Sequence, residues 1–282
     1  MSGVSRDTPD ARPKVLKAPA TAASEDLSAL PRLEDEARRI LQASSEKKVV
    51  LRLIGGVAIA MRCPSASREG LRRDYVDLDL VGHEKQSKAI KNFFAEMGYQ
   101  PRERFNALMG RKRLIFNDLV NQRRVDIFLD VFEMSHRFDF AERLELEALT
   151  LPLADLLVTK LQIVQINDKD LRDMTTLFVD HDIGSGDGET INGSYIARLC
   201  SNDWGIHKTF TSNLSKLEAS LDGYGLSSPE KDRTGASIRR LAVLIEEEPK
   251  SLAWKLRARV GERVTWYELP EADRPVVAGS FD

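Results

Sequence analysis

The chain has only two cysteines, Cys63 and Cys200, and no Cys-x-x-Cys pair in its 282 residues. This spacing offers no zinc site and fits the reducing cytosol better than a disulfide-stabilised secreted domain. No apolar run reaches the ~20 residues that span a bilayer, and the N-terminus lacks the apolar core of a secretory signal. We therefore expect a soluble, cytoplasmic protein with no membrane partner.

An excess of positive charge is also missing. The 42 lysines and arginines are offset by 44 aspartates and glutamates, so the formal net charge is -2. Proteins that bind nucleic acid without sequence preference rely on a cationic field. The charge balance therefore weakens an RNA substrate, although a local basic patch would be enough. The sequence also lacks a P-loop lysine motif and a Gly-x-Gly-x-x-Gly motif, which excludes the nucleotide sites built on them.

The clearest local pattern is an apolar run that ends in two glycines. Residues 49–54 read VVLRLI, Gly55 and Gly56 follow, and apolar residues resume at 57–61. This order predicts a strand, a glycine turn and the start of a helix. The free N–H groups at such a helix N-terminus suit phosphate, because glycine has no Cβ to block its approach. A tight turn without any ligand would give the same pattern.

Two aspartates alternate with apolar residues in 76–80, which reads VDLDL. On a strand, Asp77 and Asp79 share one face and lie about 7 Å apart. Aspartate is depleted in strands, and two carboxylates on one face repel each other unless a cation is present. Mg²⁺ prefers oxygen ligands and keeps several waters and phosphate oxygens. We therefore favour a metal site over an ordinary solvent-facing strand.

A second alternating strand supplies a further carboxylate. In 124–132, which reads RVDIFLDVF, Asp126 and Asp130 lie on the polar face. A two-metal site needs about three carboxylates to offset the charge of the ions, and Asp126 is the predicted third ligand. Asp130 lies some 13 Å further along the strand, too far to share a cation, and is either a base candidate or an exposed residue.

A lysine lies on the apolar face of the helix predicted at 153–166. Lys160 falls within a stripe of leucines, so either its stem reaches the surface or its ammonium meets a buried anion. Asp170 and Asp173 follow near the start of the next helix, where the dipole favours negative charge. The anion candidates are therefore these two residues, the strand aspartates and the phosphates of a nucleotide.

Taken together, Gly55-Gly56, Asp77-x-Asp79 and Asp126 in an alternating strand resemble the DNA polymerase β-type nucleotidyltransferase superfamily. The resemblance covers residues 49–131. It implies transfer of a nucleoside monophosphate from an NTP to a hydroxyl or phosphate acceptor. It also implies Mg²⁺ or Mn²⁺ as cofactor, with the three aspartates as metal ligands and Gly55 and Gly56 against the nucleotide.

The segment that follows is similar to the AbiEii-type branch, the toxin side of certain abortive-infection systems. Lys160 precedes Lys169-Asp170-Leu-Arg-Asp173, which implies catalytic or nucleotide-binding roles for Lys160 and Asp170, an RNA acceptor and a cognate antitoxin as candidate partner. Lincosamide- and aminoglycoside-type nucleotidyltransferases also tolerate Gly-Gly in place of the usual Gly-Ser. The acceptor therefore stays open between RNA and a small molecule, and a non-catalytic binding or regulatory module remains the rival from another class.

The expected fold is α/β (α+β), with a mixed nucleotidyltransferase-type sheet flanked by helices and followed by a helical C-terminal domain. Within it we predict short strands at 105–110, 113–116 and 264–267. The predicted organisation is a disordered tail at 1–30, a nucleotidyltransferase-like domain at 31–181, a glycine-rich linker at 182–189, a helical domain at 190–262 and a tail at 263–282.

Overall fold

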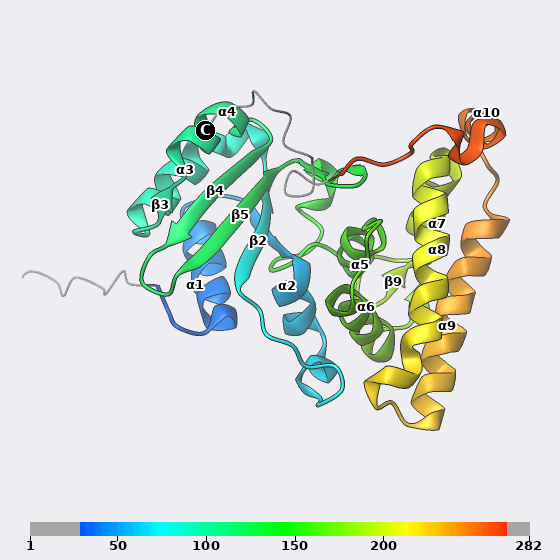
Figure 1. Cartoon of the computed structure of the whole chain (residues 1–282). Helices are drawn as coiled ribbons and strands as arrows, with labels where there is room; N and C mark the ends of the chain where they lie inside the picture. Colours follow the sequence, from blue (N-terminus) through cyan, green and yellow to red (C-terminus); the bar gives the residue numbers. More distant parts are fainter. Residues whose placement is uncertain (1–28, 270–282) are drawn as a thin grey trace, which may run out of the picture.

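The structure is a computed structural model that describes residues 29–269 (Figure 1). The tail predicted at 1–30 therefore lies almost wholly outside the described residues, as does most of the tail predicted at 263–282. Within the described part of the chain, no helix is long and apolar enough to cross a membrane.

A five-stranded mixed sheet forms the first half of the protein. Its spatial order is β1-β2-β5-β4-β3, with β2 and β5 parallel and the other neighbours antiparallel. The strands are β1 (Leu51–Ile54), β2 (Asp77–Gly82), β3 (Gln100–Pro101), β4 (Arg113–Asp118) and β5 (Arg123–Leu129). The predicted α/β class is confirmed, and so is the prediction that the glycine-turn strand and the two aspartate strands are neighbours.

Helices cover one face of this sheet (Figure 1). They are α1 (Leu33–Glu46), α2 (Gly55–Arg62) and α3 (Ser87–Glu96), while α4 (Glu103–Met109) lies along the edge of β4. Helix α3 illustrates the packing, because Ile90, Phe93 and Phe94 recur at helical spacing and are all buried. The ring of Phe94 stacks on Phe116 of β4 with the centroids 4.7 Å apart.

The second half is helical. It contains α5 (Leu153–Leu161), α6 (Asp168–Asp180), α7 (Gly193–Asn202), α8 (Trp204–Ser220), α9 (Ser228–Glu247) and α10 (Leu252–Val260). Short ribbons precede and interrupt it, with β6 (Val131–Glu133) paired to β7 (Arg137–Asp139) and β8 (Ile183–Gly184) paired to β9 (Ile191–Asn192). One hydrophobic core runs from the sheet through α9, so the predicted domain limits remain predictions.

Two predicted strands are wrong. Residues 105–110 belong to helix α4, where the Asn106 amide accepts from the Ile115 N–H at 2.8 Å and donates to the Ile115 carbonyl at 3.0 Å. This side chain thus makes the two backbone contacts that a strand would have made. Residues 264–267 form no strand. Single hydrogen bonds hold this segment instead of a strand ladder, such as the one that Trp266 Nε1 donates to Thr209 Oγ1 at 3.2 Å.

Helix α5 ends at Leu161, five residues before the predicted end, and the reason lies in helix α8. The buried Asn213 side chain donates to the carbonyls of Leu161 and Ile163, each at 2.8 Å. These contacts satisfy carbonyl groups that the helix end leaves without an intrahelical partner. Helix α7 was not predicted.

Replacing Asn213 with Ala should therefore destabilise the protein by about 2 kcal/mol, because two carbonyls at the end of α5 lose their donor. Urea unfolding measures the change. The matched control is Asn202→Ala, since this exposed side chain donates only to Arg198 O in its own helix, and its loss should cost less than about 0.5 kcal/mol. Equal losses for the two variants would show that Asn213 does not hold the helix end.

Candidate active site

The pairing of β2 with β5 brings the predicted carboxylates together. Asp79 lies directly opposite Asp126, and Asp77 lies opposite Arg124. On the other side of β2, Ile54 pairs with Asp79, so the glycine turn begins beside the same carboxylate. One stretch of the sheet therefore presents all three aspartates and the start of helix α2.

The glycine turn is built around Asp79. Gly55 has φ +71°, a left-handed conformation that favours glycine, and a Cβ there would lie 2.6 Å from Asp79 Oδ2. A Cβ on Gly56 would lie 1.8 Å from Arg73 Nη2 and 2.7 Å from Tyr75 Cε1. Gly55 therefore needs glycine for its backbone and its close carboxylate, and a side chain at position 56 would have to displace Arg73 and Tyr75.

Burial and the neighbouring charges shift the pKa of Asp79. Burial raises the pKa of Asp79 to about 6, and the charges of Asp126 and Asp77 add to the rise, while Lys160 acts in the opposite direction. Nearby like charges disfavour the ionised form of a carboxylate. A cation placed among the carboxylates would relieve that cost.

Two arginines meet Asp126, whose side chain is fully buried. Its Oδ1 accepts from Arg113 Nε at 2.9 Å. Its Oδ2 lies 2.7 Å from Arg124 Nε, and Nη2 of the same guanidinium lies 3.6 Å from Asp77 Oδ2. The Arg124 guanidinium therefore contacts the first and the third carboxylate of the predicted metal site.

The contacts of Asp126 decide whether the three aspartates fit the predicted Mg²⁺ or Mn²⁺. Within residues 29–269, no three His, Cys, Asp or Glu side chains are grouped so as to hold a metal ion, and Asp126 is turned to its arginines. Yet Asp126 Oδ2 is buried without a hydrogen-bond partner despite its short distance to Arg124, because the two groups are close but poorly aligned. A buried carboxylate oxygen with bonding capacity left fits a hard divalent cation.

The structure gives Lys160 two carboxylate partners. Its Nζ lies 2.9 Å from Asp170 Oδ1 and 2.9 Å from Asp173 Oδ2, and only 12% of its side chain is exposed. Burial lowers the pKa of the ammonium, but the charges of Asp173 and Asp170 outweigh it and raise the pKa overall. The alternative in which the stem merely reaches the surface is therefore wrong, and the partners are on α6 rather than among the strand aspartates.

Sequence reasoning missed Arg73. Its Nε and Nη2 donate to the two oxygens of Asp173 at 2.7 and 2.6 Å, and its guanidinium lies 4.2 Å from the centre of the Tyr75 ring. Asp173 thus joins Lys160 to the arginine that covers Gly56. The available signal was the Arg72-Arg73 pair four residues before the first aspartate.

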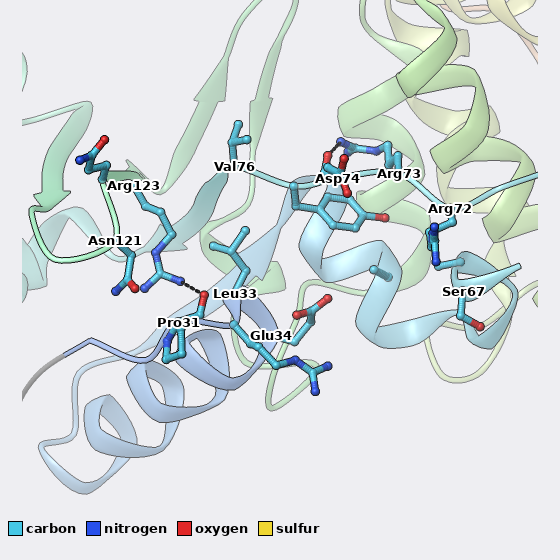
Figure 2. Close-up of a pocket in the computed structure, with 15 residues that line it drawn as sticks. Pro31, Leu33, Glu34, Ser67, Arg72, Arg73, Asp74, Val76, Asn121 and Arg123 are labelled. Atoms are coloured by element: carbon cyan, nitrogen blue, oxygen red, sulfur yellow. Dashed lines mark hydrogen bonds between the residues drawn. The ribbon is translucent and has the colours of Figure 1, made fainter. Parts of the chain in front are cut away.

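A cavity of about 750 Å³ adjoins the site (Figure 2). The segment 72–76 that leads into Asp77 forms one wall, the start of α1 a second and residues 121–123 a third. The predicted metal ligands do not line it, so Arg73 and Tyr75 stand between this cavity and the glycine turn.

Asp130 does not join the three aspartates. It has φ 55°, lies just beyond the end of β5, and contacts His83 Nδ1 at 2.9 Å and the Glu84 N–H at 3.1 Å. Its contacts tie β5 to the chain that follows β2, which is a structural use of this carboxylate.

No family model matches the chain, and no curated protein matches it. The solved structures that resemble it include the lincosamide antibiotic adenylyltransferase LnuA with bound lincomycin, at 13% identity and a TM-score of 0.40, covering 52% of this chain and 98% of that one. The antibiotic-resistance factor ANT(2'')-Ia has 14% identity and a TM-score of 0.36, covering 58% and 90%. An antigenic nucleotidyltransferase-like protein from Paracoccidioides brasiliensis has 12% identity and a TM-score of 0.40, covering 80% and 97%.

Similarity at this level assigns no family. The function must therefore be inferred from the side chains of the site itself.

Replacing Asp79 with Asn should leave the metal-free protein as stable as the wild type or stabilise it by up to ~2 kcal/mol at neutral pH, because repulsion among the carboxylates is relieved. Thermal melting in EDTA measures this change. The control is Asp222→Asn, since this carboxylate is 79% exposed beside Lys231 and should change little. A clear loss of stability for Asp79→Asn would indicate a structural role.

Replacing Lys160 with Met should destabilise the protein by about 3 kcal/mol, because Asp170 and Asp173 lose the cation between them. Adding Asp170→Asn should restore part of this loss. The surface pair of Lys231 with Asp222 provides the control, and Lys231→Met should cost less than about 1 kcal/mol. If the double variant is no more stable than Lys160→Met, the ion pair is not the source of the loss.

Proposed function

We propose that the chain is a metal-dependent nucleotidyltransferase that moves an NMP from an NTP to an acceptor hydroxyl or phosphate. The observation that carries the proposal is the register of β2 on β5. It places Asp79 opposite Asp126 and beside the glycine turn, so that carboxylates for a cation and N–H groups for phosphate meet at one point.

In this proposal, Asp77, Asp79 and Asp126 hold Mg²⁺ or Mn²⁺. Divalent ions bound there would lower the pKa of an acceptor hydroxyl and neutralise charge on the leaving pyrophosphate. Arg113 keeps Asp126 in place through Oδ1, which leaves Oδ2 for the cation. In this proposal the metal-bound Asp126 would also accept the acceptor's proton.

The phosphates of the NTP would bind at the start of helix α2. The N–H groups of the glycine turn and the positive end of the helix dipole attract them. Arg73 lies on Gly56 and Lys160 shares Asp173 with it, so both cations stand where a triphosphate would extend. Asp170 and Asp173 hold these side chains ready before the nucleotide arrives.

The acceptor we favour is a small molecule of the antibiotic type, rather than RNA with an AbiEii-like toxin and its antitoxin. A basic wall from the 101–124 region would have favoured RNA. Several of its cations are instead paired with carboxylates. These pairs are Arg111 with Glu84, Lys112 with Glu133, Arg113 with Asp126, Arg123 with Asp118 and Arg124 with Asp126.

Incubation with each radiolabelled NTP and Mg²⁺ tests the proposal, with an antibiotic panel, total RNA or lysate protein as acceptor. Label should appear on a small molecule for the wild type. Asp79→Asn should reduce transfer by about 100-fold or more, because charge stabilisation at the transferred phosphate is lost. Arg111→Gln is the control, since this side chain is 92% exposed and should leave transfer intact.

Label on RNA would contradict the small-molecule acceptor and would support an AbiEii-like toxin that acts on RNA. Nucleotide binding without transfer to any acceptor would indicate a non-catalytic binding module.

A further inference from the structure

Arg124 occupies the space between two of the proposed metal ligands. It lies two residues before Asp126 on the same face of β5 and directly opposite Asp77. Its Nε is 2.7 Å from Asp126 Oδ2, and its Nη2 is 3.6 Å from Asp77 Oδ2. One guanidinium therefore meets carboxylate oxygens that a shared cation would also use.

The two arginines on Asp126 differ in how firmly they are held. Arg113 has 19% of its side chain exposed, and its guanidinium lies 4.9 Å from the Phe128 ring centre and 5.9 Å from that of Phe105. Arg124 has 44% of its side chain exposed. Within residues 29–269, the ion pairs formed by Arg124 are with Asp77 and Asp126. Arg124 is thus the partner that can leave.

We infer that Arg124 acts as an internal cation that holds the candidate metal site closed, and that a divalent metal must displace it to bind. This inference rests on the proposed function. The metal and the guanidinium need the same lone pairs, and a carboxylate oxygen cannot serve both fully. The poor alignment at Asp126 Oδ2 makes the contact one that a divalent ion can replace.

Displacement has two consequences for the site. Before the metal binds, Arg124 offsets the repulsion among Asp77, Asp79 and Asp126, so the empty site keeps its shape. After the metal binds, the long, partly exposed side chain is released beside the nucleotide site, where its charge favours the anionic triphosphate. Metal and nucleotide would then support each other's binding through this one residue.

Mn²⁺ binding to the full chain, followed by electron paramagnetic resonance and by calorimetry, tests this inference without any turnover. Arg124→Gln should bind Mn²⁺ about tenfold more tightly than the wild type, because no charge-assisted contact has to be broken first. It should also melt at a lower temperature than the wild type in EDTA, because the three carboxylates lose an internal cation.

Two further variants make the test specific. Arg124→Lys keeps the positive charge and should bind Mn²⁺ within about threefold of the wild type, since a lysine also competes for the carboxylates. Arg111→Gln removes the same charge from an exposed position paired with Glu84, and should leave Mn²⁺ affinity unchanged. A gain shared by Arg111→Gln would mean that net charge, rather than displacement, is responsible.

The outcomes separate this inference from the proposed function. If the wild type binds Mn²⁺ but Arg124→Gln binds it equally or more weakly, the inference fails and the metal site stands. If neither protein binds Mn²⁺, with or without an NTP, both the metal site and the inference fail. Tighter binding confined to Arg124→Gln supports the inference.

Discussion

The pairing of β2 with β5 imposes the constraint on which the site depends. It sets Asp79 against Asp126 with Asp77 nearby, and three carboxylates cannot share a partly buried position without cations. Arg113 and Arg124 meet Asp126 from the same sheet, and Lys160 lowers the cost at Asp79 from α5. The cations of the surrounding elements therefore offset the negative charge of the three carboxylates.

Asp173 of α6 links a cation beside the sheet to a cation of the helical half. Its two oxygens receive Arg73 from the segment before β2, and Oδ2 also receives Lys160 from α5. The end of α5 is in turn fixed by Asn213 of α8. The helices therefore position Lys160, and apolar residues of the sheet and of these helices pack in one core.

The sequence predicted the direction of a side chain wherever the period of one strand or one helix determines it. Alternation identified Asp77, Asp79 and Asp126, and the apolar stripe identified Lys160 as inward. The partners of these residues could not be predicted, because Arg73–Asp173 is separated by 100 residues and depends on tertiary packing. The same limit explains helix α4, where Asn106 bonds to Ile115 across the turn and overrides a strand-like pattern.

The ion pairs around the candidate site differ in how readily the proposed metal and nucleotide would exchange them. In the proposed function, a divalent ion would offer Asp77 and Asp126 a stronger partner than Arg124, and phosphate oxygens would approach Lys160 and Arg73 beside Asp170 and Asp173. Displacing Arg124 releases a side chain that is 44% exposed, whereas taking Lys160 and Arg73 from Asp170 and Asp173 would leave buried carboxylates uncompensated, which is costly. This difference makes Arg124 the partner that is exchanged, and it leaves the ion pairs of Asp173 in place beside the proposed phosphate site.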